Sequence, residues 1–231
     1  VNVFRLNFSH GTAKHHAEVA ARIRQQSAIA GKYIGILADL QGPKIRISSF
    51  RDESVELAIG DRFRLDLGLA DGEGNANAVG VDYPALCTSV FRGDTLILDD
   101  GRIRLRVDDV GTSAVDCTVQ VGGVLGSRKG INRMGGGLAA PALTLKDIAD
   151  IDSLVEVRPD FVAVSFVLSE KDIFQTRELL AQHQLQAAII AKIERAEVVA
   201  DQATLDGILE ASFGVMVARG DLGVEVGDAQ L

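Results

Sequence analysis

Residues 1–40 read VNVFRLNFSHGTAKHHAEVAARIRQQSAIAGKYIGILADL, and this stretch decides the fold. Its segments 1–8 and 33–40 predict two strands, because each is short, apolar and followed by turn-forming residues. The intervening residues 12–30 predict a helix with Gly31 as its C-cap, since glycine readily adopts the left-handed conformation that ends helices. A strand, a helix and a strand in this order predict parallel pairing of the two strands.

The same alternation returns in the second half of the chain. Capping boxes at 144–147 and 169–172 predict two helix starts, and apolar runs predict further strands at 161–167, 187–193 and 214–218. Near-continuous apolar strands suit a parallel sheet that is covered on both faces. We therefore expect an α/β fold with five parallel strands. If they belong to a (β/α)8 TIM barrel, which needs eight strands, three are missing and the barrel is incomplete in this chain.

The middle of the chain has a different pattern. Short strand-like runs are separated by Gly, Asp and Asn, and Ile103, Leu105 and Val107 alternate with arginines at a period of two. This pattern predicts a mostly antiparallel, β-barrel-like domain inserted between two parts of the α/β domain. The expected boundaries are 1–43 and 142–231 for the discontinuous TIM-barrel domain, and 44–141 for the inserted β-rich domain.

The composition is that of a soluble globular protein. Of the 231 residues, 47% are hydrophobic and 24% charged, which excludes a disordered chain, a collagen and a coiled coil. The net charge of −8 argues against a nucleic-acid partner. No apolar run approaches the roughly 18 residues of a membrane helix, and no signal peptide is visible, so we expect no membrane partner and a cytoplasmic location.

The start of the chain, the two cysteines and the paired histidines carry no functional signal. The chain starts without Met inside an apolar stretch, and we expect it to be the interior of a longer protein. Cys87 and Cys117 match neither a disulfide framework nor a metal-ligand spacing, and they are expected to be buried or half-buried thiols. His15 and His16 are expected to be a solvated pair on the first helix.

Polar residues gather where the predicted strands end, and in α/β folds these carboxyl ends hold the functional site. Arg5, Asn7 and Ser9 are two residues apart, which places them on one face of an extended chain. They could hold a phosphate or a cation, or the strand could simply run into solvent. A second cluster at 39–46 combines one carboxylate with two cations, and a solvated hinge explains it equally well.

Two further clusters follow the later strands. Lys192 and Glu194 share one face of an otherwise apolar strand, where a lysine is costly unless it is paired or used. Asp221 follows the strand at 214–218, and together with Glu194 it provides two hard oxygen ligands, the minimum for Mg²⁺. The Arg-Gly-Asp tripeptide that ends at Asp221 is similar to a cell-adhesion signal, but its flanks are typical of a buried strand.

These residues lie in motifs that resemble the pyruvate kinase family, in the family's order along the whole chain. The matching blocks are RLNFSHG (5–11), DLQGPKIR (39–46), VDYPAL (81–86), LDDGRIRL (98–105), GSRKGIN (126–132), PALTLKD (141–147), AKIE (191–194) and EASFGVMVARGDLGVE (210–225). The resemblance implies a barrel with a β-rich lid domain after its third strand. It also implies that the first strand, the last two strands and a C-terminal regulatory domain, which binds allosteric effectors, lie outside this chain.

The reaction that the resemblance implies is transfer of the phosphoryl group of phosphoenolpyruvate to ADP, giving pyruvate and ATP, the last step of glycolysis. Arg5 would face the transferring phosphoryl group, and Lys192 would stabilise that group and the enolate left behind. Glu194 and Asp221 would ligate Mg²⁺ or Mn²⁺, and the backbone around Gly220 and Asp221 would hold the substrate carboxylate. The nucleotide side would comprise Asn7, His10, Arg46 and Lys129. A homotetramer is expected, and the group that protonates the enolate would lie beyond this chain.

One departure from the family pattern changes the expected cofactors. The usual DTKGPEIR is DLQGPKIR here, so Lys44 stands where the family has Glu. Family members with the usual pattern bind K⁺ in a region that corresponds here to Asn7, Ser9, Asp39 and Leu40. We expect the ammonium of Lys44 to replace that cation, because it supplies the same single positive charge, so that K⁺ is not required.

Other departures and two alternative functions stay open. Arg133 and Met134 replace Leu and Pro, Ala139 stands in place of Asp, and Phe213 replaces another Asp. One alternative is a metal-dependent aldolase or lyase of the phosphoenolpyruvate and pyruvate barrel group, which would lack the inserted domain with Lys129. The other is a binding or regulatory module without activity, because missing barrel strands would leave sheet edges open.

Overall fold

The computed structural model of the protein describes residues 1–138 and 140–227. The chain divides into two compact units. The first comprises Val1–Pro43 and Ala140–Ala218, and the second comprises Lys44–Ala139 and Arg219–Leu231. The chain therefore leaves the first unit after Pro43 and returns to it at Ala140.

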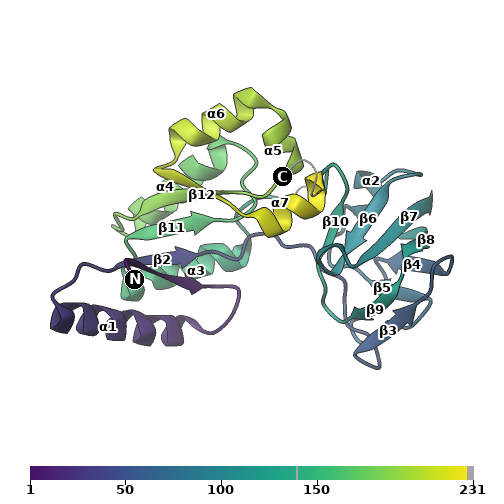
Figure 1. Cartoon of the computed structure of the whole chain (residues 1–231), viewed down its shortest axis with the longest axis horizontal. Helices are drawn as coiled ribbons and strands as arrows, with labels where there is room; N and C mark the ends of the chain where they lie inside the picture. The colour runs from purple at the N-terminus through teal and green to yellow at the C-terminus, as the bar shows by residue number, and fades with distance from the viewer. Residues whose placement is uncertain (139, 228–231) are drawn as a thin grey trace. The chain divides into compact units, whose positions relative to one another are not determined.

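The first unit is built on a five-stranded parallel sheet with the strand order β1-β2-β11-β12-β13 (Figure 1). In its register, Asn7 lies opposite Asp39, and Lys192 lies opposite Met216. The five parallel strands predicted from the apolar runs are confirmed, and they form part of a (β/α)8 barrel. Their bounds are β1 (Val3–Asn7), β2 (Gly35–Asp39), β11 (Phe161–Val164), β12 (Ala188–Ile193) and β13 (Gly214–Val217).

Helices follow the strands, and their ends agree with the capping residues. The Oγ1 of Thr12 accepts a hydrogen bond from the backbone N–H of His15, and Gly31 ends the same helix with φ 61°. The capping boxes that begin at Thr144 and Ser169 are both present, so these predicted helix starts are confirmed. The helices of this unit are α1 (Ala13–Ala30), α3 (Leu145–Val157), α4 (Glu170–Gln182), α5 (Ala196–Ala200) and α6 (Gln202–Ala211).

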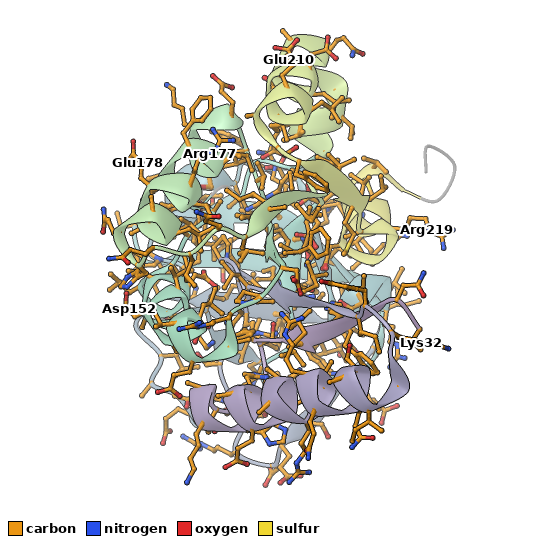
Figure 2. All side chains as sticks on the ribbon, turned by 90° about the vertical axis from the view of Figure 1, so that its left-hand side faces the viewer. Lys32, Asp152, Arg177, Glu178, Glu210 and Arg219 are labelled. Carbon is orange, nitrogen blue, oxygen red and sulfur yellow. The ribbon has the colours of Figure 1, made fainter. Side chains whose placement is uncertain are left out.

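The helices pack in pairs and expose their charged faces. Helix α1 contacts α3, and α4 contacts α6. Charged side chains such as Lys32, Glu178 and Glu210 point away from the ribbon (Figure 2), and all three are exposed. The apolar side chains between the helices and the sheet, such as Ile151 and Ile173, are fully buried, so burial of these faces stabilises the unit.

Four of the five predicted strands end earlier than expected, β1, β2 and β13 by one residue and β11 by three. Strand β11 ends at Val164, because Phe166 adopts φ 55°, a left-handed conformation that cannot continue a strand. Strand β1 ends at Asn7, and the backbone N–H of Ser9 turns back to donate to Oδ1 of Asn7 at 3.1 Å. The expectation that Arg5, Asn7 and Ser9 share one extended face is therefore wrong for Ser9.

The two outer strands of the parallel sheet carry exposed apolar side chains. Val3 and Phe4 on β1 are exposed, as are Val215 and Val217 on β13. Outer strands also leave backbone N–H and C=O groups without a neighbouring strand. In a complete barrel these outer strands would pair with neighbouring strands. A five-strand part of a barrel leaves both edges exposed.

The second unit is a β-structure whose strand pairs are antiparallel except for β4 with β5. A six-stranded sheet has the order β10-β6-β7-β8-β4-β5, and β3 pairs with β9. The prediction of mostly antiparallel strands is confirmed. The bounds are β3 (Ser54–Leu57), β4 (Arg62–Asp66), β5 (Ala78–Gly80), β6 (Thr95–Leu98), β7 (Ile103–Val110), β8 (Ala114–Val121), β9 (Gly123–Gly126) and β10 (Ile131–Arg133).

Alternation along β7 sets the core of the second unit. Ile103, Leu105 and Val107 are buried, while Arg104 and Arg106 are exposed, as the period of two predicts. Among the described residues of this unit, three short segments are helical: α2 (Leu86–Ser89), η1 (Asp99–Gly101) and α7 (Arg219–Val226). Helix α7 groups with this unit, whereas the sequence assigned residues 142–231 to the TIM-barrel domain; the domain boundaries stay a prediction.

Within 1–138 and 140–227, no helix has the length and apolar character needed to cross a membrane.

Candidate active site

Asp39, the last residue of β2, joins two cationic side chains at the carboxyl end of the parallel sheet. Its side chain is 1% exposed, with Oδ2 2.5 Å from Nε of Arg5 and Oδ1 3.3 Å from Nζ of Lys192. A lone buried carboxylate would be very costly, and two adjacent cations compensate its charge. The structure thus brings together three residues that the sequence singled out.

Lys192 is held by three oxygen atoms. Besides Oδ1 of Asp39, its Nζ lies 3.0 Å from Oε1 of Glu194 and donates to Oγ of Ser165 at 2.8 Å. Oδ1 of Asp39 accepts no hydrogen bond from the described residues, so at 3.3 Å it stabilises the ammonium by charge alone. This accounts for a lysine on an otherwise apolar strand, which the sequence expected to be paired or used.

Glu194 directly follows β12 and is almost completely buried. Its Oε1 meets the ammonium of Lys192, and its Oε2 accepts a hydrogen bond from the backbone N–H of Phe166 at 2.7 Å. The ring of Phe166 lies under the guanidinium of Arg195, with 5.2 Å from Cζ to the ring centroid. The carboxylate is therefore oriented at both oxygens.

The turn after β1 carries the residues expected on the nucleotide side. His10 is exposed, and its backbone carbonyl meets Nε2 of His16 at 2.9 Å. His16 is buried and stacks on Phe8, with 4.2 Å between ring centroids. The expectation of a solvated His15 and His16 pair is wrong for His16.

Two residues of this site were missed at the sequence level, although each had a signal. His16 lies four and seven residues before Ala20 and Ile23, the other buried positions of α1, so helical spacing places it on the apolar face. Ser165 interrupts the apolar sequence that begins at Phe161 and lies directly after β11. A buried hydroxyl group needs a hydrogen-bond partner. The Ser165 hydroxyl donates to the backbone carbonyl of Leu40 and accepts from Nζ of Lys192.

In the second unit, Lys44 contacts the start of α7. Its Nζ lies 2.9 Å from Oδ1 of Asp221 and 3.7 Å from Oδ1 of Asp100. Gly220, the residue before Asp221, has open space where a Cβ would lie. The region expected to hold the monovalent cation belongs to the first unit and comprises Asn7, Ser9, Asp39 and Leu40. The replacement of K⁺ by Lys44 stays a prediction.

Two more expected nucleotide-side residues lie in the second unit. Nζ of Lys129 is 2.8 Å from Oδ1 of the buried Asp99. Nη1 of Arg46 donates to the backbone carbonyl of Arg128 at 3.0 Å. Lys129 is thereby tied to η1, and Arg46 to the turn between β9 and β10.

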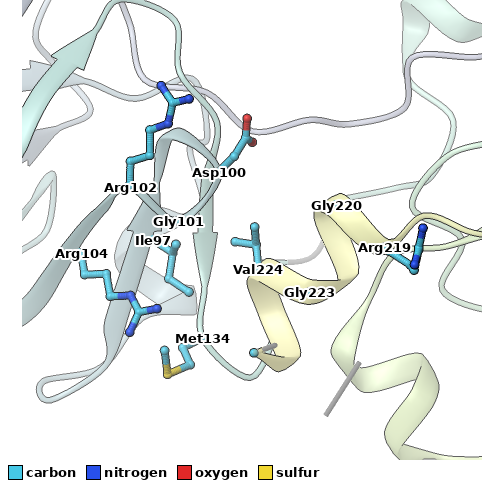
Figure 3. Close-up of a pocket in the computed structure, with 11 residues that line it drawn as sticks. Ile97, Asp100, Gly101, Arg102, Arg104, Met134, Arg219, Gly220, Gly223 and Val224 are labelled. Carbon is cyan, nitrogen blue, oxygen red and sulfur yellow. The ribbon is translucent and has the colours of Figure 1, made fainter. Parts of the chain in front are cut away.

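A cavity of about 460 Å³ lies beside α7 within the second unit (Figure 3). Glycines and arginines make up most of its wall, together with Asp100, Met134 and two apolar side chains. Gly220 is the one residue of the expected substrate site among its lining residues, which are Ile97, Asp100, Gly101, Arg102, Arg104, Met134, Arg219, Gly220, Gly223, Val224 and Gly227.

The residues expected to bind a divalent metal are carboxylates, as a hard cation requires. Glu194 belongs to the first unit and Asp221 to the second. In the part of the chain that the structure describes, no group of three or more His, Cys, Asp or Glu side chains could hold a metal ion. Each carboxylate instead contacts a lysine, Glu194 with Lys192 and Asp221 with Lys44.

The structure describes the surroundings of three of the four other departures from the family pattern, and it explains neither Met134 nor Phe213. Nε of Arg133 lies 2.9 Å from Oδ2 of Asp94. Met134 is exposed and lines the cavity beside α7. Phe213 is 73% exposed, and its ring centroid lies 6.0 Å from that of Phe161. Ala139 lies outside the described residues.

Comparison with known proteins places the chain in a family. The family model "Pyruvate kinase, barrel domain" matches residues 1–231. A pyruvate kinase of Haemophilus influenzae is 51% identical over 230 residues, which are 100% of this chain and 48% of that protein. Pyruvate kinase II of Salmonella typhimurium is 50% identical with the same coverage. A pyruvate kinase of Geobacillus stearothermophilus is 42% identical over 229 residues, 98% of this chain and 38% of that protein.

The chain spans about half the length of the most similar of these relatives. The match nevertheless includes both units and every residue of the strand-end cluster, Arg5, Asp39, Lys192 and Glu194. From this match and the parallel sheet that carries the cluster, it follows that the chain belongs to the pyruvate kinase barrel-domain family.

Proposed function

We propose that the protein containing this chain transfers the phosphoryl group of phosphoenolpyruvate to ADP, forming pyruvate and ATP. The observation that carries this proposal is the cluster of Arg5, Asp39 and Lys192 at the strand ends of a chain that belongs to the family. Phosphoryl transfer needs positioned groups and neutralisation of spread negative charge rather than covalent chemistry by the protein. Two fixed cations beside one another suit that requirement.

Arg5 is proposed to bind the transferring phosphoryl group. Its Nε is committed to Asp39, and its side chain is 50% exposed. The two Nη groups would therefore meet phosphoryl oxygens, in the paired geometry that makes guanidinium groups good phosphate ligands. The buried carboxylate fixes the direction in which the guanidinium points.

Lys192 is proposed to stabilise the phosphoryl group in flight and the enolate that remains. Its side chain is 12% exposed, so its charge acts at a site with little water. Electrostatic stabilisation is stronger in such a setting than in bulk water. The oxygens of Ser165, Asp39 and Glu194 place the ammonium before substrate binds.

Glu194 and Asp221 are proposed to hold Mg²⁺ or Mn²⁺. Both are carboxylates, which fits the oxygen ligands that these cations prefer. The metal, when bound, would supply positive charge that neutralises phosphoryl and substrate oxygens. The substrate carboxylate is assigned to the backbone N–H groups around Gly220 and Asp221, at the first turn of α7.

The nucleotide is assigned to Asn7, His10, Arg46 and Lys129. Arg46 and Lys129 are cationic and would bind its phosphates. We also propose that the inserted β-unit, which carries Lys129, acts as a lid over the site. The full-length protein is proposed to be a homotetramer in the cytoplasm.

Lys44 is proposed to replace K⁺. A lysine provides a single compact positive charge, as K⁺ does. Its contact with Asp221 supports a placement near the proposed metal ligand. The region assigned to the cation comprises Asn7, Ser9, Asp39 and Leu40.

The test is pyruvate formation from phosphoenolpyruvate and ADP by the full-length protein with Mg²⁺, in K⁺ buffer and in K⁺-free buffer. Equal rates are expected. Activity only with K⁺ would support the proposed reaction but show that Lys44 does not replace K⁺. No pyruvate in either buffer would overturn the proposed function. Lys192→Gln should abolish turnover, whereas Lys171→Gln, at an exposed position of α4, serves as the matched control.

A further inference from the structure

We propose that the turn formed by Ser165 and Phe166 positions the two functional side chains of the β12 end, Lys192 and Glu194. The inference rests on the proposed function of Lys192 and Glu194. Ser165 and Phe166 are positioning residues, because each acts through another side chain.

Ser165 fixes the ammonium of Lys192. Its hydroxyl is buried and donates to the backbone carbonyl of Leu40 at 2.7 Å. Because its proton is committed to that carbonyl, Oγ presents its lone pairs to Nζ of Lys192 at 2.8 Å. The serine thus bridges the loop after β2 and the side chain on β12.

Phe166 fixes the carboxylate of Glu194 through its backbone. Its N–H donates to Oε2 at 2.7 Å while its φ is 55°, a region that a bulky L-residue rarely adopts. Such a conformation persists only where the surroundings enforce it, and it is concentrated at functional sites. Here it directs the N–H group toward the carboxylate, which an extended continuation of β11 would not do.

The surroundings of the turn leave it little freedom. A Cβ built on Gly42 would lie 2.7 Å from Cβ of Ser165 and 3.0 Å from Cδ2 of Phe166, so the loop after β2 packs directly on both residues. The guanidinium of Arg195 also lies over the Phe166 ring, with Cζ 5.2 Å from the ring centroid. A turn packed in this way can hold two partners at fixed positions.

The two contacts complement each other. Lys192 contacts Oε1 of Glu194, while Phe166 contacts Oε2 of the same carboxylate. Ser165 and Phe166 are adjacent in the chain, so one turn sets the ammonium and the carboxylate relative to each other. Positioning of this kind affects turnover more than binding of a nucleotide that other residues contact.

The test uses Ser165→Ala and Ser165→Cys in the full-length protein. Alanine removes the acceptor, and cysteine fills the space with a sulfur that is a weak acceptor, which keeps a folded variant available should the alanine variant fail to fold. The matched control is Thr176→Val, which removes another buried hydroxyl that donates to a backbone carbonyl, that of Asp172 at 2.8 Å. Thr176→Val removes a comparable hydrogen bond at a residue for which no contact with a proposed functional side chain is described.

Both serine variants are expected to lower kcat by about 10- to 100-fold with KM for ADP nearly unchanged, and Thr176→Val is expected to leave kcat unchanged. A second readout needs no turnover: reductive methylation of Lys192 by formaldehyde and cyanoborohydride, followed by peptide mass spectrometry. Loss of its serine partner should raise the methylation rate of Lys192 about two- to tenfold relative to the exposed Lys171.

Wild-type methylation rates at Lys192 in both serine variants would overturn the proposal, as would a kcat loss of equal size in Thr176→Val. If the wild-type protein forms no pyruvate, the proposed function fails, and the methylation rate then decides the positioning role by itself. A raised methylation rate with lowered kcat in both serine variants supports the proposal.

Discussion

Nζ of Lys44 lies 2.9 Å from Oδ1 of Asp221, so a carboxylate proposed to bind a divalent metal is ion-paired with a lysine. Glu194, the other proposed ligand, has the same relationship with Lys192 at 3.0 Å. An ammonium group occupies one carboxylate oxygen in each case and repels a cation that approaches it. Metal binding by these residues therefore competes with two ion pairs.

This competition predicts that Lys44→Gln binds Mn²⁺ more tightly than the wild type, by about three- to tenfold, because a positive charge is removed from beside Asp221. The measurement is a Mn²⁺ titration followed by electron paramagnetic resonance without substrate. Arg64→Gln is the control, since it breaks a comparable ion pair with Asp116 elsewhere in the second unit. An unchanged or weaker Mn²⁺ affinity in Lys44→Gln would contradict the prediction.

Asp147 is predicted to be the most costly capping residue to lose. It is fully buried and accepts three hydrogen bonds, from the backbone N–H of Gly42 at 3.1 Å and from the N–H and Oγ1 of Thr144 at 2.9 and 2.6 Å. Asp147→Ala leaves buried donors unpaired and should lower the free energy of unfolding by about 2–4 kcal/mol.

Urea unfolding followed by circular dichroism measures that loss. The control is Asp61→Ala, which removes an exposed carboxylate that accepts from the N–H of Ala58. Its donor returns to water, so a loss below about 1 kcal/mol is expected. Equal losses of unfolding free energy in the two variants would show that burial does not increase the contribution of Asp147 to stability.

The parallel sheet could be predicted from the sequence because its signals are local. Five apolar runs, a glycine after α1 and two capping boxes each report on a few neighbouring residues, and all were confirmed. Failures occurred where a tertiary contact decides the backbone. The run 161–167 is uniformly apolar, yet the strand stops at Val164 because Gly42 and Glu194 impose a turn at Phe166.

In the site, too, contacts set by local spacing could be predicted, and contacts between distant elements could not. Lys192 and Glu194 could be paired from their spacing on one strand face, because alternation is a local property. The link from Arg5 to Asp39 joins strands 34 residues apart, and no spacing rule specifies that contact. Ser165 and His16 were missed because their partners come from other elements, although their positions within apolar patterns carried a signal.

The two cysteines are predicted to differ in reactivity. Burial, followed by the charges of Asp108 and Asp116, raises the pKa of the Cys117 thiol to about 12. At pH 8 only about one in 10⁴ of such thiols is ionised, and the thiolate is the reactive form. Burial and the charge of Asp66 also raise the pKa of Cys87, but this residue is partly exposed.

Iodoacetamide at about pH 8 should therefore alkylate Cys87 in the native protein and spare Cys117, as peptide mass spectrometry would show. Guanidinium chloride should make both residues react. Alkylation of Cys117 at a similar rate in the native protein would mean that the sheet formed by β7 and β8 opens far more often than its burial indicates.

Asp201 is predicted to stabilise α6 in a pH-dependent way. Hydrogen bonds from the side chain and backbone of Thr204 lower the pKa of Asp201 below its ordinary value of 3.8. A group whose pKa is lowered by folding stabilises the folded state above its ordinary pKa, and this contribution is lost as the pH falls through the folded value.

The melting temperature of Asp201→Ala should therefore lie below that of the wild type near pH 7, and the gap should narrow at pH values below about 4. Asp201→Asn is the matched variant, because it keeps a capping oxygen without a charge. Its melting temperature should approach that of the wild type as the pH falls. A gap between the alanine variant and the wild type that stays constant down to about pH 3 would contradict the charge effect.

Gly42 and Gly31 allow backbone strain to be separated from contact with the Ser165 turn. Both have left-handed φ values, 67° and 61°, but a Cβ on Gly31 would meet nothing within 4 Å, whereas one on Gly42 would lie 2.7 Å from Cβ of Ser165. Gly31→Ala should cost about 1–2 kcal/mol of stability, the ordinary penalty of that conformation, and leave kcat unchanged. Gly42→Ala should cost at least about 1 kcal/mol more, because the added methyl group must displace the turn. It should also lower kcat, because displacement of Ser165 moves the ammonium of Lys192. Urea unfolding and steady-state kinetics of the two variants measure both effects, and a Gly42→Ala enzyme with wild-type kcat would show that the turn can move without disturbing Lys192.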